Sequence, residues 1–347
     1  MSKDEAAPGV GLDVGTAFIV GARQHGDKIN LRSVRNAYFS MAQNKIMQEM
    51  LSRAGAKEGE NVGYLEFGDK IVVIGDKALA YASSTHGDTC RPMKKGVMSP
   101  DDHAEAIMAV IIEKAIGKAQ FKGEVCRFSV PAEPFDEEID IIFHEGIMTA
   151  ILSELGYTPK PLNEGEAVCY SELSSDEDRL SGGAFSFGGG QSNGCVIFEG
   201  RPVINFSVAR GGDWIDEKSF KHARMRSAAE MTQFKETHAV DLLNPNGRDE
   251  AALSLYYKHH VSYVVGAVVD LLNREGAKVP AFDKPVRWIV SGGTSLAKGF
   301  LELCRQEFAK HKLPFTLKSV DHASDPLKST AKGCLIAARL DEDSKKS

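Results

Sequence analysis

The sequence predicts an α/β protein made of two related halves, because one pattern of strands and glycine turns occurs twice. Residues 10–34 and 184–206 each hold three short β-prone runs. The first two runs are joined by a glycine-rich turn and the last two by another tight turn. Asp13 and Ser186 stand at equivalent places in the two copies, half a chain length apart. A chain of 347 residues is long enough for two domains of about 100–200 residues each.

Helical patterns follow the first copy and the second. Ser99 before Pro100 is typical of a helix start, and apolar residues over 107–116 recur at the three- and four-residue spacing of one buried face. A second helix is predicted over 136–155 and a long third helix over about 251–274. These helices lie where each half needs cover for a sheet.

Single strands and a tail complete the predicted elements. Residues 125–131 form an apolar run that ends in Ser-Val-Pro, and residues 286–290 form another before a glycine turn. The last seven residues, DEDSKKS, are predicted to be a solvated tail, because they carry charge and no apolar pattern.

Composition excludes several classes of protein. The net charge of −6 argues against a nucleic-acid binder that relies on overall charge, and no apolar run reaches the roughly 18–20 residues of a membrane span. The start, MSKDEAAPG, is charged, unlike the apolar centre of a secretion signal. The six cysteines form no Cys-x-x-Cys pair, so we expect reduced thiols in a cytoplasmic protein.

Three glycine turns that follow strands predict a nucleotide site. They begin at Gly15, Gly188 and Gly292. Glycine lets backbone N–H groups approach a phosphate without a Cβ in the way, and successive N–H groups form anion-binding concavities. A carboxylate at Asp13 suits such a site if hydrated Mg²⁺ lies between it and the phosphates. No G-x-x-x-x-G-K-S/T motif is present, and the second turn misses G-x-G-x-x-G by one position, so neither a P-loop nor a Rossmann site is supported.

The three turns resemble the two phosphate motifs and the adenosine motif of the actin, sugar-kinase and heat-shock-chaperone ATPase superfamily. The segments GLDVGTA, FSFGGGQSNGCVI and WIVSGGTSLAKGF carry this resemblance, in the family order. RPMKKGV, SVPA, LNEGEAV, ARGGD and DPLKSTAKG resemble further segments of bacterial actins such as MreB and MamK. The similarity runs from about residue 9 to about residue 340, and the chain length is that of a bacterial actin, too short for a chaperone's peptide-binding domain.

The resemblance implies an actin-like bilobed fold. Two duplicated ribonuclease-H-like domains, each a mixed sheet flanked by helices, would hold ATP in the cleft between them. Domain I would span 1–165 with a small subdomain at about 35–75, and domain II 166–329 with one at about 226–280. Residues 330–347 would form a helix that returns to domain I, followed by the charged tail.

The resemblance also implies roles for individual residues. Asp13 would hold hydrated Mg²⁺, and Glu164, at a helix start, would orient the attacking water. Lys235 and Glu236 match an adenosine-contacting pair, although Lys-Glu is a common dipeptide. The implied nucleotide contacts are Gly15, Thr16, Ala17, Gly188, Gly189, Gly190, Gln191, Ser192, Lys235, Glu236, Gly292, Gly293, Thr294 and Leu296.

One position departs from the family pattern. The second phosphate motif begins with an aspartate in the family, and here that place is Ser186. A serine can hydrogen-bond to a water but carries no charge, and positioning of metal and water supplies most of the catalysis in phosphoryl transfer. The sequence therefore predicts ATP binding with slow or altered hydrolysis, with Glu164 and Ser186 as the catalytic positions.

The functional prediction is an ATP-dependent cytoskeletal filament of the bacterial actin type, in the cytoplasm, whose main partner is itself. A polar N-terminus gives no sign of a membrane anchor, and a cargo or regulatory partner stays unidentified. Two alternatives remain: a nonpolymerising ATP-binding regulatory protein, which Ser186 favours, and a small-molecule kinase. For the kinase, no base for an acceptor hydroxyl is evident outside the shared cleft.

Overall fold

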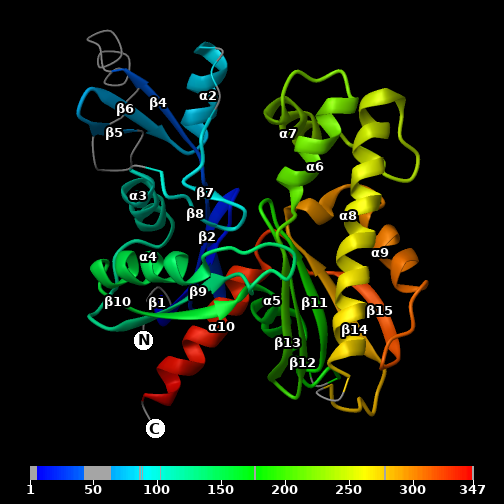
Figure 1. Ribbon diagram of the computed structural model, residues 1–347. Coiled ribbons are helices and arrows are strands. Elements are labelled where there is room, and N and C mark those ends of the chain that lie inside the picture. The colour runs from blue at the N-terminus through cyan, green and yellow to red at the C-terminus, as the bar shows by residue number, and fades with distance from the viewer. Residues whose placement is uncertain are drawn as a thin grey trace.

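The computed structural model forms two lobes that stand side by side (Figure 1). It describes residues 6–42, 64–85, 87, 89–101, 103–175, 177–276 and 279–345. Each lobe is built on one five-stranded mixed sheet. Within the described residues, no helix combines the length and the apolar character that a bilayer span requires.

The sheet of lobe I begins with three antiparallel strands and adds two parallel ones. Its strands are β1 (Ala6–Val14), β2 (Phe18–His25), β3 (Lys28–Arg35), β9 (Glu124–Val130) and β10 (Tyr157–Asn163). Their order across the sheet is β10-β9-β1-β2-β3, with β9 parallel to both β1 and β10. Buried Leu12, Ile19 and Phe128 lie in its core.

The sheet of lobe II has the same plan. Its strands are β11 (Gly182–Phe187), β12 (Ser192–Phe198), β13 (Arg201–Val208), β14 (Val286–Ser291) and β15 (Leu317–His322). Their order is β13-β12-β11-β14-β15, so the first three strands are antiparallel and the last two parallel, as in lobe I. This identical order confirms the predicted duplication and the α/β bilobed fold class.

Helices cover these sheets, and a small extra sheet caps lobe I. The helices of lobe I are α3 (Ala104–Ile116) and α4 (Ile141–Glu154), and those of lobe II are α6 (Gly212–Ser219), α7 (Ala228–Thr237), α8 (Gly247–Arg274) and α9 (Phe300–Phe308), with short turns η1 (Phe220–His222) and η2 (Gly293–Leu296). The cap consists of β4 (Tyr38–Ala42), β5 (Tyr64–Phe67), β6 (Lys70–Ile74) and α2 (Asp76–Thr85), and the hairpin β7 (Met93–Lys94)–β8 (Val97–Met98) follows it. The three strands of the cap lie within the predicted small subdomain at 35–75, of which residues 43–63 lie outside the described residues, and α2 follows it.

Two predicted helix starts are wrong. Helix α3 begins at Ala104, because His103 adopts a left-handed φ of 70° and the Ser99 hydroxyl donates to Asp101 at 2.6 Å in a local turn. Helix α4 begins at Ile141, five residues later than predicted. Its N-cap is Asp140, whose side chain accepts a hydrogen bond from the Phe143 N–H at 2.8 Å.

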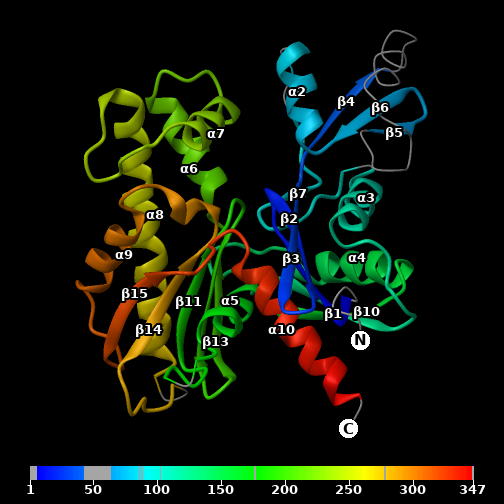
Figure 2. The same cartoon turned by 180° about the vertical axis from the view of Figure 1, so that it is seen from behind.

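Two helices cross between the lobes and fix how they sit. Helix α5 (Glu164–Glu172) follows the last strand of lobe I and packs on the lobe II sheet, where Gly165 lies against the backbone of Gly194. Helix α10 (Ser329–Ser344) follows the last strand of lobe II and packs on β1 of lobe I, where Gly11 lies against its backbone (Figure 2). The two helices touch at Gly333, where a Cβ would lie 1.7 Å from the carbonyl oxygen of Ala167.

The predicted solvated tail is wrong for Asp341–Ser344, which continue α10. The carboxylate of Glu342 is buried and accepts a hydrogen bond from the Val125 N–H at 2.6 Å, while Asp341 pairs with Arg127 at 2.6 Å. These charged residues therefore attach α10 to lobe I, because their partners lie on β9, about 200 residues earlier in the chain.

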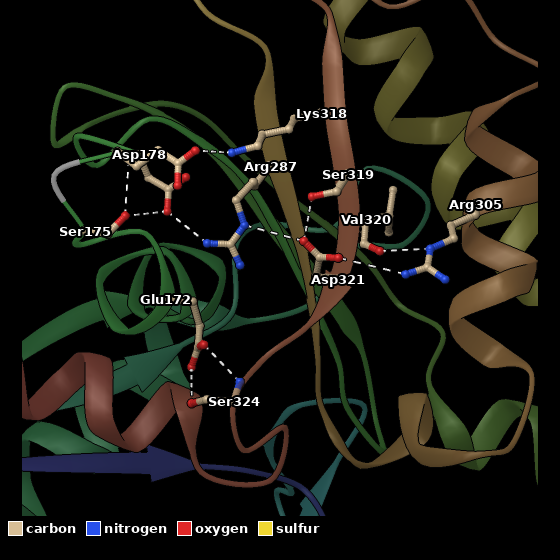
Figure 3. Close-up of polar contacts among 11 residues, drawn as sticks. Glu172, Ser175, Asp178, Arg287, Arg305, Lys318, Ser319, Val320, Asp321 and Ser324 are labelled. Atoms are coloured by element: carbon tan, nitrogen blue, oxygen red, sulfur yellow. Dashed lines mark hydrogen bonds and ion pairs between the residues drawn. The ribbon is translucent and has the colours of Figure 1, made fainter.

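Polar contacts at the far end of α5 tie it to the β14–β15 side of lobe II (Figure 3). The Glu172 carboxylate accepts hydrogen bonds from the N–H and hydroxyl of Ser324, at 2.9 and 3.0 Å. Arg287 on β14 bridges Asp178, at 2.9 Å, and Asp321 on β15, at 3.4 Å. The end of α5 and the loop that follows it are thereby held to the β14–β15 side of the lobe II sheet.

Replacing Gly333 with Ala tests the helix crossing. We expect Gly333→Ala to lower the free energy of unfolding by about 1–3 kcal/mol or more, because the new methyl group overlaps backbone that cannot rotate away. Gly266→Ala in α8 is the matched control, because a Cβ there meets no atom within 4 Å. It should raise stability by roughly 0.5–1 kcal/mol through helix propensity. Urea unfolding of both variants measures the difference, and equal effects would contradict the crossing.

Candidate functional site

The first glycine turn joins β1 to β2 at the edge of lobe I that faces lobe II. Asp13 is the next-to-last residue of β1, and its Oδ1 accepts a hydrogen bond from the Ser129 hydroxyl at 3.1 Å. The same Ser129 oxygen accepts from the Val14 N–H at 2.8 Å. The side chain of Asn36 donates to the Gly15 carbonyl at 3.0 Å. The turn is thus held in one shape by side chains from β9 and the β3–β4 connection.

The second glycine turn joins β11 to β12 in lobe II. It closes with a hydrogen bond from the Gly188 N–H to the Gln191 carbonyl at 2.9 Å. The Gly188 carbonyl then accepts from the Gly212 N–H at 3.0 Å and from the Thr294 hydroxyl at 2.9 Å. The start of α6 and the third glycine turn are therefore attached to the second.

The turns of the two lobes meet directly. The Gly96 N–H, in the β7–β8 turn, donates to the Thr16 hydroxyl at 3.1 Å. A Cβ on Gly190 would lie 2.4 Å from that same nitrogen and 2.6 Å from the Thr16 oxygen. Gln191 adds a hydrogen bond to the Lys95 carbonyl at 2.6 Å. Only glycine fits at position 190, because backbone from the opposite lobe fills the space of a side chain.

The third turn follows β14 and continues into η2. Gly292 has a φ of 90°, and a Cβ there would lie 2.2 Å from the Phe187 carbonyl oxygen, so both conformation and space require glycine. Thr294 is buried and reaches the second turn, whereas the side chain of Leu296 is half exposed. A large apolar side chain beside a glycine turn provides a surface on which a flat ring could lie.

Two carboxylates from the two ends of the crossing meet in the cleft. Burial raises the pKa of Asp13 above its ordinary value, against the effect of the Ser129 hydrogen bond. Burial also raises the pKa of Glu164, and the nearby Asp13 charge raises it further, while the side chains of Ser186 and Asn193 oppose this. Two carboxylates this close hold a proton or a cation between them more readily than two negative charges.

Some predicted site residues use their side chains inside lobe II instead. The Ser192 hydroxyl donates to the Arg210 carbonyl at 2.9 Å and lies 3.0 Å from His260 Nε2. Lys235 Nζ contacts the buried Asp216 carboxylate at 2.7 Å. The structure places Ser192 as an anchor of the second turn and Lys235 beside the start of α6.

Glu236 lies at the mouth between the lobes. Its carboxylate pairs with Arg35, at the end of β3, at 3.6 Å. Arg35 also bonds the Asp76 carboxylate at 3.0 Å. The two neighbours therefore contact different lobes: Lys235 contacts Asp216 in lobe II, and Glu236 contacts Arg35 in lobe I.

The sequence motifs gave no role to two further sets of contacts between the lobes, those of Arg91 and those of Asp136. Arg91, just before β7, donates to both oxygens of Asp213 on α6, at 2.8 and 2.9 Å. Asp136, after β9, accepts from the Ala209 N–H at 2.8 Å and from the Tyr263 hydroxyl at 3.0 Å. The motifs RPMKKGV and ARGGD contain Arg91 and Asp213, but nothing local pairs residues from opposite lobes.

The residues present fit a nucleotide with a divalent cation. Asn193 has 1% of its surface exposed, its Oδ1 accepts from the Ala132 N–H at 3.1 Å, and its buried Nδ2 has no protein partner. This donor lies beside Glu164, where a water or phosphate oxygen would satisfy it. Glycine turns, hydroxyl donors and an acidic pair in one cleft are the donor set that phosphate and hydrated Mg²⁺ need.

Known structures resemble this chain throughout its length. MamK in a double helical filament is 14% identical, with a TM-score of 0.66 over 95% of this chain and 98% of that one. MreB5 of Spiroplasma citri is 16% identical, with a TM-score of 0.66 in its ADP-bound form (98% of each chain) and 0.67 in its AMPPNP-bound form (99% of each chain). No curated protein sequence matches.

A sequence profile of the volactin family matches residues 9–338. That span includes both lobes, all three glycine turns and most of α10. The predicted actin-like fold is confirmed, because the MamK and MreB5 structures share it. The chain belongs to the volactin family and has the actin-like fold.

Proposed function

We propose that this protein is a cytoplasmic, actin-like cytoskeletal protein that binds ATP with Mg²⁺ between its lobes and assembles head to tail into filaments. The observation that carries the proposal is the meeting of the glycine turns from both lobes at Thr16, Gly96 and Gly190, beside the acidic pair Asp13 and Glu164. A ligand held by both lobes couples its chemistry to their relative position.

The chain's own groups divide the binding of ATP among them. N–H groups of the first two turns and the hydroxyl of Thr16 would take the phosphates, and the turn at Gly292–Thr294 with Leu296 would take adenosine. Asp13 would hold Mg²⁺ through water, and the cation would neutralise the phosphate charge. Among the described residues no three acidic, histidine or cysteine side chains gather at a metal position, so water and phosphate would supply the other ligands.

Hydrolysis would depend on Glu164. Its carboxylate starts α5, capped by the Asn163 side chain, which accepts from the Gly165 N–H at 3.0 Å. A fixed carboxylate can orient a water and take its proton, and the raised pKa brings it toward neutral pH. Ser186 and the free Nδ2 of Asn193 would position the same water without adding negative charge, so turnover would be slow.

Filament formation is supported by the fold and by the MamK and MreB5 relatives. MamK has been solved as a double helical filament. A head-to-tail contact that does not close on itself repeats without limit, and a change in lobe angle would alter it. Candidate second functions are a nonpolymerising ATP-binding regulator, favoured by Ser186, and a small-molecule kinase.

One experiment separates the three functions. Purified protein is incubated with ATP and Mg²⁺ and followed by light scattering, sedimentation and electron microscopy. Filaments that need nucleotide would support the proposal. Dispersed protein that binds ATP without turnover would identify the regulator, and dispersed protein that phosphorylates a sugar or an acid would identify the kinase.

Ser186→Asp tests the cause of slow hydrolysis. The new carboxylate would help to hold the metal-bound water, so phosphate release should rise by about tenfold or more. Glu164→Gln is the matched control, which should lower phosphate release by about a hundredfold while ATP still binds. Wild-type turnover as fast as that of Ser186→Asp would overturn this explanation.

Asp13→Asn tests the acidic pair without nucleotide. A folded-state pKa above the ordinary value near 4 means that the folded protein binds the proton more tightly, so stability falls as pH rises from about 4 through the folded-state pKa. The variant should lose less stability than wild type between pH 5 and pH 8 and gain less from ATP with Mg²⁺. Thermal unfolding of both proteins isolates the effect of Asp13, because the buried His144 and His260 contribute equally to the pH dependence of the two proteins. Equal pH profiles would contradict it.

A further inference from the structure

The Arg91–Asp213 pair joins the two lobes beside the first and second glycine turns. Asp213 is in the first turn of α6, and its N–H donates to the Gly189 carbonyl at 2.8 Å. A Cβ on Gly189 would lie 3.8 Å from Asp213 Oδ1 and 3.5 Å from the Ala17 methyl group. The guanidinium of Arg91 therefore lies beside the place where the first and second turns face each other.

The other cations near these turns are already engaged with carboxylates that face elsewhere. Lys95 pairs with Glu137 and Lys235 with Asp216. Arg210 lies over the Tyr263 ring at 3.7 Å and pairs with Asp136. The Arg91 guanidinium, in contrast, contacts Asp213, whose N–H donates to Gly189 of the second turn.

The present partner of Arg91 holds it weakly. The side chains of Arg91 and Asp213 are 27% and 34% exposed, and ion pairs that water reaches contribute about 0–1 kcal/mol. Arginine binds phosphate through two parallel N–H donors, and such charge-assisted bonds are roughly twice as strong as neutral ones. Exchanging a carboxylate for a phosphate oxygen is therefore favourable for this guanidinium.

We propose that Arg91 is a nucleotide-binding residue that leaves Asp213 for the phosphate chain of ATP. This inference rests on the proposed function. Arg91 then supplies positive charge in a cleft that lacks the family aspartate at Ser186 but still holds Asp13, Glu164 and Asp213. The same exchange breaks one of the ion pairs that join the lobes, while the Arg35–Glu236 and Arg210–Asp136 pairs are left unchanged.

The Arg91–Asp213 and Arg35–Glu236 pairs both join the lobes, so substitutions in them supply a matched test. ATP and adenosine affinities are measured for wild type, Arg91→Gln, Arg91→Lys, Asp213→Asn and Arg35→Gln, with thermal unfolding as a check on folding. Arg91→Gln should weaken ATP by on the order of tenfold to a hundredfold and leave adenosine unchanged. Arg91→Lys should restore part of the loss, and Asp213→Asn should bind ATP at least as tightly as wild type.

Arg35→Gln distinguishes direct binding of ATP by Arg91 from a role of Arg91 in holding the lobes together. If Arg91 only holds the lobes together, Arg91→Gln and Arg35→Gln will shift ATP and adenosine affinity by the same factor, and the proposal is overturned. Unchanged ATP affinity in Arg91→Gln also overturns it, while the nucleotide site itself stands. Failure of wild type to bind ATP would instead refute the proposed function.

Discussion

The rest of the structure depends on the close crossing of α5 and α10. At Gly333 the two helices approach until backbone touches backbone, and Gly11 and Gly165 seat each helix on a sheet in the same way. Backbone packing this tight leaves no room for the helices to slide past each other, because protein interiors are already close-packed. The crossing joins the lobes at one closely packed base.

That geometry explains why the acidic pair is where it is. Asp13 ends the strand on which α10 packs, and Glu164 begins α5, so the base of the crossing brings two carboxylates together. Burial raises the pKa values of both carboxyls, and the charge of Asp13 raises that of Glu164 further, so two ionised carboxylates are unfavourable here at neutral pH. A hydrated cation would remove that penalty, which is why the acidic pair supports the proposed binding of ATP with Mg²⁺.

Contacts above the crossing are weaker and easier to change. They are the hydrogen bond from the Gly96 N–H to the Thr16 hydroxyl, the hydrogen bond from the Gln191 side chain to the Lys95 carbonyl, and the two partly exposed ion pairs of Arg91 and Arg35. Each contributes about 1 kcal/mol or less, and the proposed exchange of a carboxylate for phosphate concerns the Arg91 pair alone. A closely packed base with weaker contacts above it suits the proposed filament subunit, in which the lobe angle would change with the bound nucleotide.

The sequence alone determined the local features: the duplicated strand pattern, the three glycine turns, the buried face of α3 and the missing aspartate at Ser186. These depend on spacing and residue type within a few positions, where backbone sterics decide the outcome. The tertiary structure decided the Arg91–Asp213 pair and the burial of Glu342. In both cases the partner lies on another element, distant along the chain, and no local pattern carries its position.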